Sequence, residues 1–206
     1  MKTKLKSKSR IPATNGTSIV SIATPADPVP ALRLDLGCGP NHKPGFVGVD
    51  SIAFPGVDVV TDLRKTWPWK DNTVDEVHMS HCLEHFDAIE RVHVYNEMWR
   101  VMKPGAKAQI ICPYWSSGRA YGDPTHKWPP ISTFSFFYIL KSWRMANAPH
   151  TDFSNWPLGF KCDFDASGGF NLHPKVAERD QAYIEYAMTF YMEACQDVFM
   201  TLTARK

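Results

Sequence analysis

Hydrophobic residues in the first part of the chain fall into short runs, each ended by polar or turn-forming residues. Four such runs occupy residues 32–36, 46–49, 57–60 and 74–79. Most are rich in β-branched residues, and this length and composition are typical of buried parallel strands. The pattern therefore predicts four strands before residue 80.

A longer segment with helical spacing follows the fourth run. Residues 87–102 begin with Asp87 and Glu90 at the spacing of a capping box and are stopped by the Lys-Pro-Gly sequence at 103–105. The apolar residues expected near one face are Ile89, Val92, Met98, Trp99 and Met102. Residues 108–112 predict a fifth strand. Strands that alternate with helices favour an α/β, doubly wound sheet.

The next segment, residues 113–145, departs from this alternation. It carries aromatic residues, prolines and glycines without clear periodicity, and only residues 133–143 predict a helix. Insertions of this kind after a strand often shape a substrate site, so we expect one here. Beyond it, residues 160–172 predict a strand region, 181–194 a helix and 198–204 a closing strand. Residues 31–206 are therefore expected to form a single domain.

Residues 1–30 differ from the rest in composition. Basic residues crowd the first ten positions, and four prolines follow, so this segment has too little apolar surface to offset the entropy of ordering. We predict a flexible basic and proline-rich N-terminal tail. It is either a solvated arm or an electrostatic tether to nucleic acid. The whole chain, with 23 basic and 21 acidic residues, has a net charge of only +2, which gives no strong preference for nucleic acid or membrane.

The cysteines and the apolar runs bear on the compartment. Five cysteines lie far apart, without a Cys-x-x-Cys pair, which argues against a disulfide framework or a zinc ribbon and favours a reducing cytosol. No apolar stretch approaches the ~20 residues of a membrane helix, and the start lacks the apolar core of a signal peptide. We therefore expect a cytoplasmic protein that does not bind membranes.

The first two strands carry candidate binding chemistry at their ends. The first ends in Asp35, followed by Gly37 and Gly39, and the second is followed directly by Asp50. Ligands of parallel sheets bind beyond the carboxyl ends of the strands. Glycine there admits a ligand where a Cβ would clash, and a carboxylate can accept hydrogen bonds from both ribose hydroxyls. The pattern predicts a ligand that contains a nucleoside.

A dinucleotide fingerprint requires a third glycine, but this chain has His42 there. Instead, the sequence resembles the class I S-adenosylmethionine-dependent methyltransferases over residues 31–113. The resemblance is carried, in order, by LDLGCGP (34–40), VGVD (47–50), Asp62-Leu63, VDEVHMSHCLEHF (74–86) and MKPGAKAQIICP (102–113). It implies a mostly parallel, seven-stranded Rossmann-like sheet with an antiparallel final strand, and S-adenosyl-L-methionine as the cofactor.

The resemblance also implies roles for single residues. Asp35, Gly37 and Gly39 would line the methionine part of the cofactor, together with Ser80 and His81. Asp50 would hold the ribose, with Ser51 and Ile52 beside the adenine. Asp62 would accept a hydrogen bond from the adenine amino group, and Leu63 would add an apolar and backbone contact.

The spacing from Asp35 to Asp50 is shorter than the family pattern. Only 50 − 35 = 15 positions separate the two acids, and Pro44 cannot sit inside a helix. We expect the helix between the first two strands to be lost or reduced to a turn, as in a compact subgroup of small methyltransferase-domain proteins that this chain resembles most.

Candidate acceptor chemistry lies in GDPTHKW, residues 122–128. Asp123 and His126 are the candidate catalytic residues, in keeping with a similar Asp-Pro-x-His element in the subgroup; the alternative is that Asp123 caps a turn and His126 packs. His81 and His85 in HCLEH have the spacing of metal ligands on a helix. The order is not that of zinc proteases, and no second cluster offers a third ligand, so no metal site is expected.

The function expected from these residues is transfer of a sulfonium methyl group to a nucleophilic acceptor by in-line displacement. The alternatives are a protein that binds S-adenosylmethionine or S-adenosylhomocysteine without turnover, and a nicotinamide oxidoreductase. His42 and the Asp62-Leu63 pair argue against the oxidoreductase. The sequence leaves open whether the acceptor is a small molecule or nucleic acid, and it does not give the oligomeric state.

Overall fold

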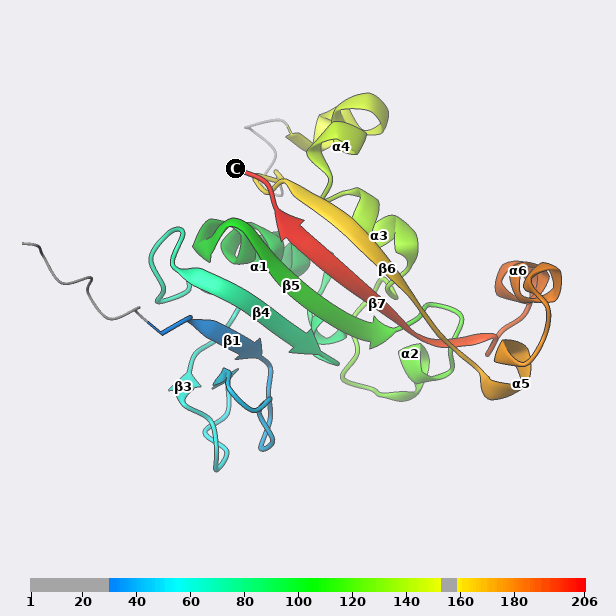
Figure 1. Ribbon diagram of the computed structural model, residues 1–206, viewed down its shortest axis with the longest axis horizontal. Coiled ribbons are helices and arrows are strands. Elements are labelled where there is room, and N and C mark those ends of the chain that lie inside the picture. The colour runs from blue at the N-terminus through cyan, green and yellow to red at the C-terminus, as the bar shows by residue number, and fades with distance from the viewer. Residues whose placement is uncertain (1–29, 153–158) are drawn as a thin grey trace, which may run out of the picture. The chain divides into compact units, whose positions relative to one another are not determined.

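The computed structural model describes residues 30–152 and 159–206. The predicted tail falls almost entirely on residues 1–29, which lie outside the described part. The described chain is built on a seven-stranded sheet in the order β3-β2-β1-β4-β5-β7-β6 (Figure 1). The strands are β1 (Arg33–Leu36), β2 (Val47–Asp50), β3 (Val59–Val60), β4 (Val74–Ser80), β5 (Met102–Pro113), β6 (Phe164–Leu172) and β7 (Cys195–Ala204).

Strand directions agree with the prediction. β1 pairs in parallel with β2 and β4, β2 with β3, and β4 with β5, whereas β7 is antiparallel to both of its neighbours, β5 and β6. Because β1 is central among the parallel strands and β2 and β4 flank it, the carboxyl ends of these three strands meet at one edge. The sheet therefore brings the segments after β1, β2 and β4 together, although they lie far apart in the sequence.

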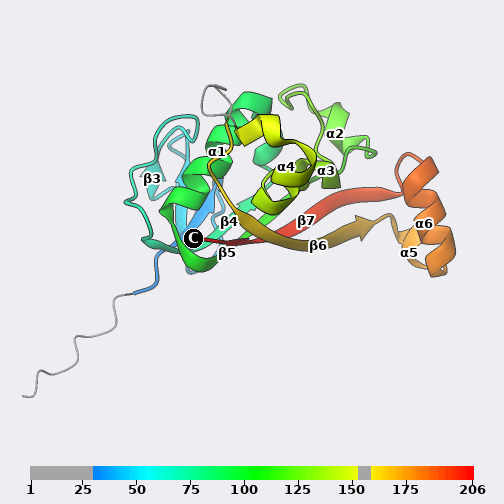
Figure 2. The same ribbon diagram turned by 90° about the horizontal axis from the view of Figure 1, so that it is seen from above.

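Helices α1 (Ala88–Val101), α3 (Thr133–Phe137) and α4 (Lys141–Asn147) lie on the same face of the sheet (Figure 2). α5 (Pro174–Ala177) and α6 (Gln181–Phe190) lie at the far end of the β6–β7 hairpin. α2 (Arg119–Gly122) and the 3₁₀ helices η1 (Leu83–His85) and η2 (Pro149–Asp152) complete the described elements. None of the helices in the described part is long and apolar enough to cross a membrane.

The opposite face of the sheet bears no helix in the described part of the chain (Figure 2). Residues 37–46 form turns, which confirms the expected loss of the helix between β1 and β2, and no described helix separates β2, β3 and β4 either. The residues of β4 match this arrangement: Val77 and Met79 are fully buried, whereas Glu76 and His78 are only partly so. β4 thus alternates between buried and partly buried positions instead of being buried on both faces, as its apolar run had suggested.

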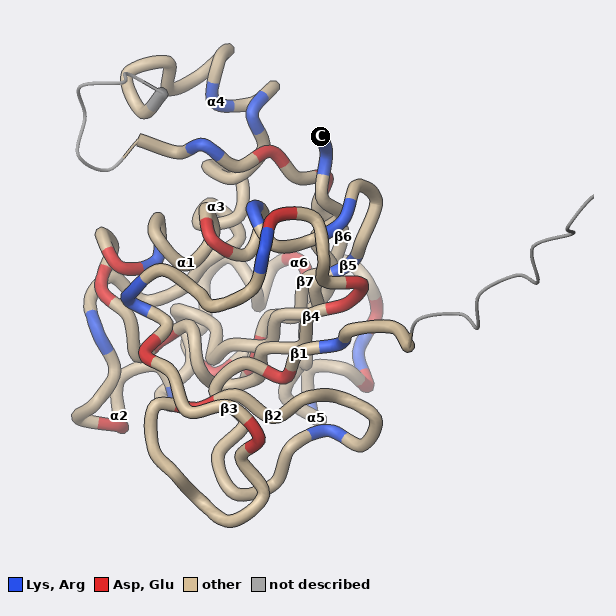
Figure 3. Tube along the Cα trace, turned by 90° about the vertical axis from the view of Figure 1, so that its left-hand side faces the viewer, with Lys and Arg blue, Asp and Glu red and all other residues tan. Residues whose placement is uncertain are grey.

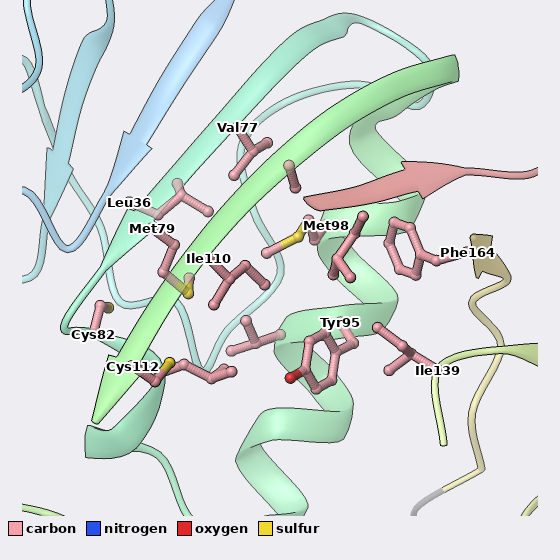
Figure 4. Close-up of a cluster of buried hydrophobic side chains, with 14 of the residues drawn as sticks. Leu36, Val77, Met79, Cys82, Tyr95, Met98, Ile110, Cys112, Ile139 and Phe164 are labelled. Atoms are coloured by element: carbon pink, nitrogen blue, oxygen red, sulfur yellow. The ribbon is translucent and has the colours of Figure 1, made fainter. Parts of the chain in front are cut away.

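The core lies between the sheet and α1 (Figure 4). Leu36, Val77 and Ile110 from the strands are fully buried there, each contributing about 1.5–3 kcal/mol. The capping box of Asp87 and Glu90 is present. The prediction of the buried face is confirmed for Met98 and Met102, which are fully buried, but the other buried residues of α1 are Arg91, Val94, Tyr95 and Val101. Ile89 is 57% exposed, because the sheet is contacted by the stripe from residue 91 onward.

The segment after β5 is less regular than its sequence suggested. The predicted helix over residues 133–143 is two short helices, α3 and α4, separated at residues 138–140. The predicted helix over 181–194 ends at Phe190, and β7 begins at Cys195 rather than at residue 198. The pairing of β7 with β6, which includes Cys195, sets the start of that strand, and periodicity alone does not fix such boundaries.

Candidate functional site

A cavity of about 410 Å³ lies at the carboxyl ends of β1, β2 and β4, and we call it the first cavity. Such a position, beyond the strand ends of a parallel sheet, is where ligands of these folds bind. Eight residues predicted from the sequence line it: Gly37, Gly39, Asp50, Ser51, Ile52, Asp62, Leu63 and His81. The sheet therefore gathers into one place residues from four separate segments of the chain.

The glycine turn after β1 forms one wall of the first cavity. Gly37 and Gly39 have φ values of +70° and +56°, a conformation that residues with a Cβ rarely adopt. A Cβ on Gly37 would stand 2.6 Å from the Cβ of Cys82 and would also clash with its thiol, whereas one on Gly39 would meet nothing within 4 Å. Gly37 thus permits close packing beneath the turn, and Gly39 leaves the cavity side open.

Asp50 at the end of β2 faces the same turn. Its Oδ2 accepts a hydrogen bond from Gly39 N (2.9 Å), and its Oδ1 accepts one from Ile52 N (3.0 Å). Each carboxylate oxygen has two lone-pair directions, so both oxygens retain acceptor capacity for a ligand. The two backbone donors hold the carboxylate in a fixed orientation in the cavity wall.

Asp62 is a second oriented carboxylate in the first cavity. Its Oδ1 accepts hydrogen bonds from Arg64 Nε (2.8 Å) and Arg64 N (3.0 Å). These bonds and the guanidinium charge hold the pKa of Asp62 below its usual range. Asp62 is therefore an anion near neutral pH and can accept a hydrogen bond from an amino or hydroxyl group.

Two predicted cofactor residues, Asp35 and Ser80, are not part of the cavity lining. Asp35 is only 4% exposed; its Oδ1 lies 2.6 Å from His78 Nδ1, and its Oδ2 accepts a hydrogen bond from Lys43 N (2.7 Å). These two partners orient the Asp35 carboxylate, and its contact with the methionine part of the cofactor stays a prediction. Asp35 thereby fixes the turn that replaces the missing helix. Ser80 lies two residues after His78 in β4, so its side chain is on the same side of the strand as that of His78, and it also lies outside the lining.

A second cavity of about 600 Å³ adjoins the first. The two share His81 and His85. The second cavity contains both predicted catalytic residues, Asp123 and His126, which come from the insertion after β5. It also contains charged residues of other elements, Glu84 and Arg119. The two neighbouring cavities thus have a common wall formed by His81 and His85.

His81 stands between the two cavities in a strained conformation. Its φ is +52°, which is uncommon for a residue other than glycine and is typical of functional sites. Its backbone N donates to Ile111 O (2.9 Å), which holds the end of β4 against β5. The Glu84 carboxylate, 3.4 Å from His81 Nδ1, raises the pKa of His81.

Asp123 and His126 lie close to each other, with 3.7 Å between Asp123 Oδ2 and His126 Nε2. Asp123 also caps its turn, since its Oδ1 accepts hydrogen bonds from Thr125 N (2.8 Å) and Thr125 Oγ1 (2.6 Å). These bonds lower the pKa of Asp123. His126 Nδ1 lies 3.2 Å from Ala120 O, so this nitrogen carries the proton and Nε2 is the basic atom. Asp123 thus caps its turn, and both Asp123 and His126 line the second cavity.

Arg91 is a residue that sequence reasoning missed. It is only 6% exposed, and its guanidinium donates hydrogen bonds to Leu83 O, Lys127 O and Pro129 O. It thereby joins η1 to the loop that carries His126. An arginine within an amphipathic helix gives no sequence signal for this role. Six further residues of the first cavity were also not predicted: Phe54, Thr61, Arg64, Cys82, His85 and Phe86.

Comparisons with known proteins agree with this geometry. Residues 41–110 match the family model described as a methyltransferase domain. A solved S-adenosylmethionine-dependent methyltransferase from Archaeoglobus fulgidus is similar over 84% of this chain and 86% of its own, with a TM-score of 0.56 and 19% identity. A chain in the complex between the Haloferax volcanii Trm112 methyltransferase activator and a methyltransferase is similar over 86% and 83%, with a TM-score of 0.52 and 16% identity. No curated protein matches the sequence.

Proposed function

We propose that this chain is a class I S-adenosylmethionine-dependent methyltransferase, which holds S-adenosylmethionine in the first cavity and a nucleophilic acceptor in the second. The observation that carries this proposal is the orientation of Asp50 by Gly39 N and Ile52 N at the end of β2. A carboxylate fixed there matches the paired hydroxyls of a ribose.

The residues of the first cavity suit the remaining parts of the cofactor. Asp62 offers an acceptor to the adenine amino group, and Ile52 and Leu63 offer apolar surface to the ring. Gly39 leaves room beside the turn for the amino-acid part, and Gly37 lets Cys82 pack beneath that turn. When bound, S-adenosylmethionine supplies a methyl group on a positively charged sulfur, which needs alignment and exclusion of water more than further activation.

The second cavity favours a polar acceptor. Its ionisable side chains, Glu84, His85, Arg119, Asp123 and His126, surround a space that borders the first cavity through His81 and His85. We propose that His126 acts as a general base: its Nε2 accepts the proton of a hydroxyl, amine or thiol. Asp123 would hold the resulting positive charge at 3.7 Å.

The cofactor assignment is tested by calorimetric titration of the purified protein with S-adenosylhomocysteine and, separately, with NADH. We expect binding of the first and not of the second. Absence of S-adenosylhomocysteine binding would contradict the proposal. Incubation of a cell extract with labelled S-adenosylmethionine then separates an enzyme from a binding protein, because only an enzyme labels a product.

The acceptor class, the tail and the compartment belong to the same proposal. Basic and acidic positions are interspersed along the described trace (Figure 3), so we assign any nucleic-acid contact to the basic residues of the tail.

Fractionation of the labelled product into RNA, DNA, protein and small molecules tests the acceptor. Deletion of residues 1–28 should leave S-adenosylhomocysteine affinity unchanged. A cytoplasmic location is supported by the thiol state of Cys38, Cys82, Cys112 and Cys195.

A further inference from the structure

The second cavity holds a cluster that the two-cavity arrangement by itself does not explain. Glu84, His85 and His126 each direct one ligand-type atom to a common region, and these atoms lie within 4.8 Å of one another. Glu84 and His85 belong to η1, whereas His126 comes from the loop after β5, 41 positions beyond His85. The third ligand that the sequence did not reveal is thus supplied by the fold.

Glu84 is the least expected member of the cluster. It is only 5% exposed, and neither of its carboxylate oxygens takes part in a hydrogen bond within the described part of the chain. The nearest cationic group is His81 Nδ1, at 3.4 Å from Oε1. A buried carboxylate without hydrogen bonds costs free energy unless a cation compensates it. The carboxylate therefore points to a ligand that carries positive charge.

The two histidines are oriented as metal ligands are. Thr125 Oγ1 donates to Asp123 Oδ1 (2.6 Å) and therefore accepts from His85 Nδ1, which lies 3.0 Å away. His126 Nδ1 donates to Ala120 O at 3.2 Å. Each ring thus has its proton on Nδ1 and a lone pair on Nε2. Such outer partners, which fix the tautomer and the ring direction, are typical of histidines that bind a metal.

We propose that Glu84, His85 and His126 bind a divalent transition-metal ion, zinc in the first place, which presents the acceptor to the methyl donor. Two imidazoles and one carboxylate with an open fourth position are the ligand set of catalytic zinc sites. Tetrahedral bonds of about 2.1 Å place ligand atoms about 3.4 Å apart, so atoms that now lie within 4.8 Å of one another must approach by up to about 1.4 Å on binding. Such a shift is within the reach of side-chain rotation.

The position of the cluster suggests what the ion does. All three side chains line the second cavity and His85 also lines the first, so an ion held by them would lie in the acceptor cavity next to the methyl donor. There a hydroxyl or thiol acceptor binds the ion, which replaces His126 Nε2 in activating the acceptor once that nitrogen is a ligand, and the acceptor loses its proton to water. Its lone pair forms the new bond to the methyl carbon as the carbon–sulfur bond breaks, and that bond's electron pair stays on sulfur. The products are the methylated acceptor and neutral S-adenosylhomocysteine.

The catalytic part of this inference rests on the proposed function, whereas metal binding does not, so the two are tested separately. Untagged, chelator-treated protein is titrated with Zn²⁺ by calorimetry and with Co²⁺ by visible absorption, which reports the coordination of the ion. We expect one bound ion per chain. The substitutions His85→Asn and His126→Asn should each weaken Co²⁺ binding at least about 10-fold. Glu84→Gln should weaken it as well, and this substitution is chosen because it keeps the side-chain volume and so favours folding.

The matched control is His93→Asn, since His93 is a partly exposed histidine of α1 whose Nε2 lies 2.9 Å from Lys65 O, away from both cavities. It should bind Co²⁺ as the unchanged protein does. Equal Co²⁺ affinity in all four variants, or no stoichiometric binding by the unchanged protein, would overturn the inference and leave Glu84 as the ion-pair partner of His81. Retained S-adenosylhomocysteine binding in such a result would show that the proposed function still stands.

Discussion

Asp50→Asn gives the sharpest test of the first cavity. The substitution keeps the shape of the side chain but leaves one carbonyl oxygen to accept hydrogen bonds, so one of the two backbone donors, Gly39 N or Ile52 N, then faces an amide NH₂ group. One ribose hydroxyl loses its charged acceptor at the same time.

The magnitude follows from the hydrogen bonds lost. A hydrogen bond to a charged group contributes about 1.5–3 kcal/mol, so removal of one such bond to the ligand and misorientation of the other should cost about 2–3 kcal/mol. Since about 1.4 kcal/mol corresponds to a tenfold change in affinity, the Kd for S-adenosylhomocysteine should rise about 30- to 150-fold. Isothermal titration calorimetry measures this change directly.

Asp58→Asn is the matched control. Asp58 also accepts a hydrogen bond from a backbone N–H of β2, that of Gly48 at 2.7 Å, but it is not part of the first cavity lining. The amide oxygen of Asp58→Asn can still accept this single bond, so this variant should keep its fold and its affinity, and only Asp50→Asn should lose affinity. If Asp50→Asn binds S-adenosylhomocysteine within about threefold of the unchanged protein, the carboxylate does not hold the ribose and the reasoning fails.

Three further predictions concern the stability of the fold. Gly37→Ala should lower stability by about 2–4 kcal/mol, through its positive φ and the clash with Cys82, whereas Gly39→Ala should cost only about 1–2 kcal/mol; similar Tm values for both would refute this. Arg91→Met should cost about 2–4 kcal/mol and speed proteolysis near Lys127, because three carbonyls lose their donor; an unchanged denaturation midpoint would argue against it. Lys103 holds the pKa of Asp75 below its usual range across a 2.6 Å contact. That stability is present above the unfolded pKa and is lost as pH falls through the lower folded pKa, so Lys103→Met should unfold at higher pH during acid titration; coincident acid transitions would show the pair to be ineffective.

Much of the first cavity could be predicted from the sequence because its residues are local. Gly37, Gly39 and Asp50 occur at the ends of short apolar runs, and a parallel sheet places all such ends at one edge. The missing helix between β1 and β2 was equally predictable, since fifteen positions with Pro44 leave no room for one. The chain's local pattern therefore determined the strands, their ends and the binding edge.

Only the tertiary structure decided which side chains point away from that edge and which distant segments meet. Asp35 proved to hold His78 and Lys43 N, because alternation along β1 and β4 sets both side chains on the same side of the sheet. The approach of His126 to Glu84 and His85 depends on the path of an aperiodic loop, which Arg91 holds in place. Contacts between residues so far apart depend on packing across the whole fold, and no local pattern of hydrophobic and polar positions encodes them.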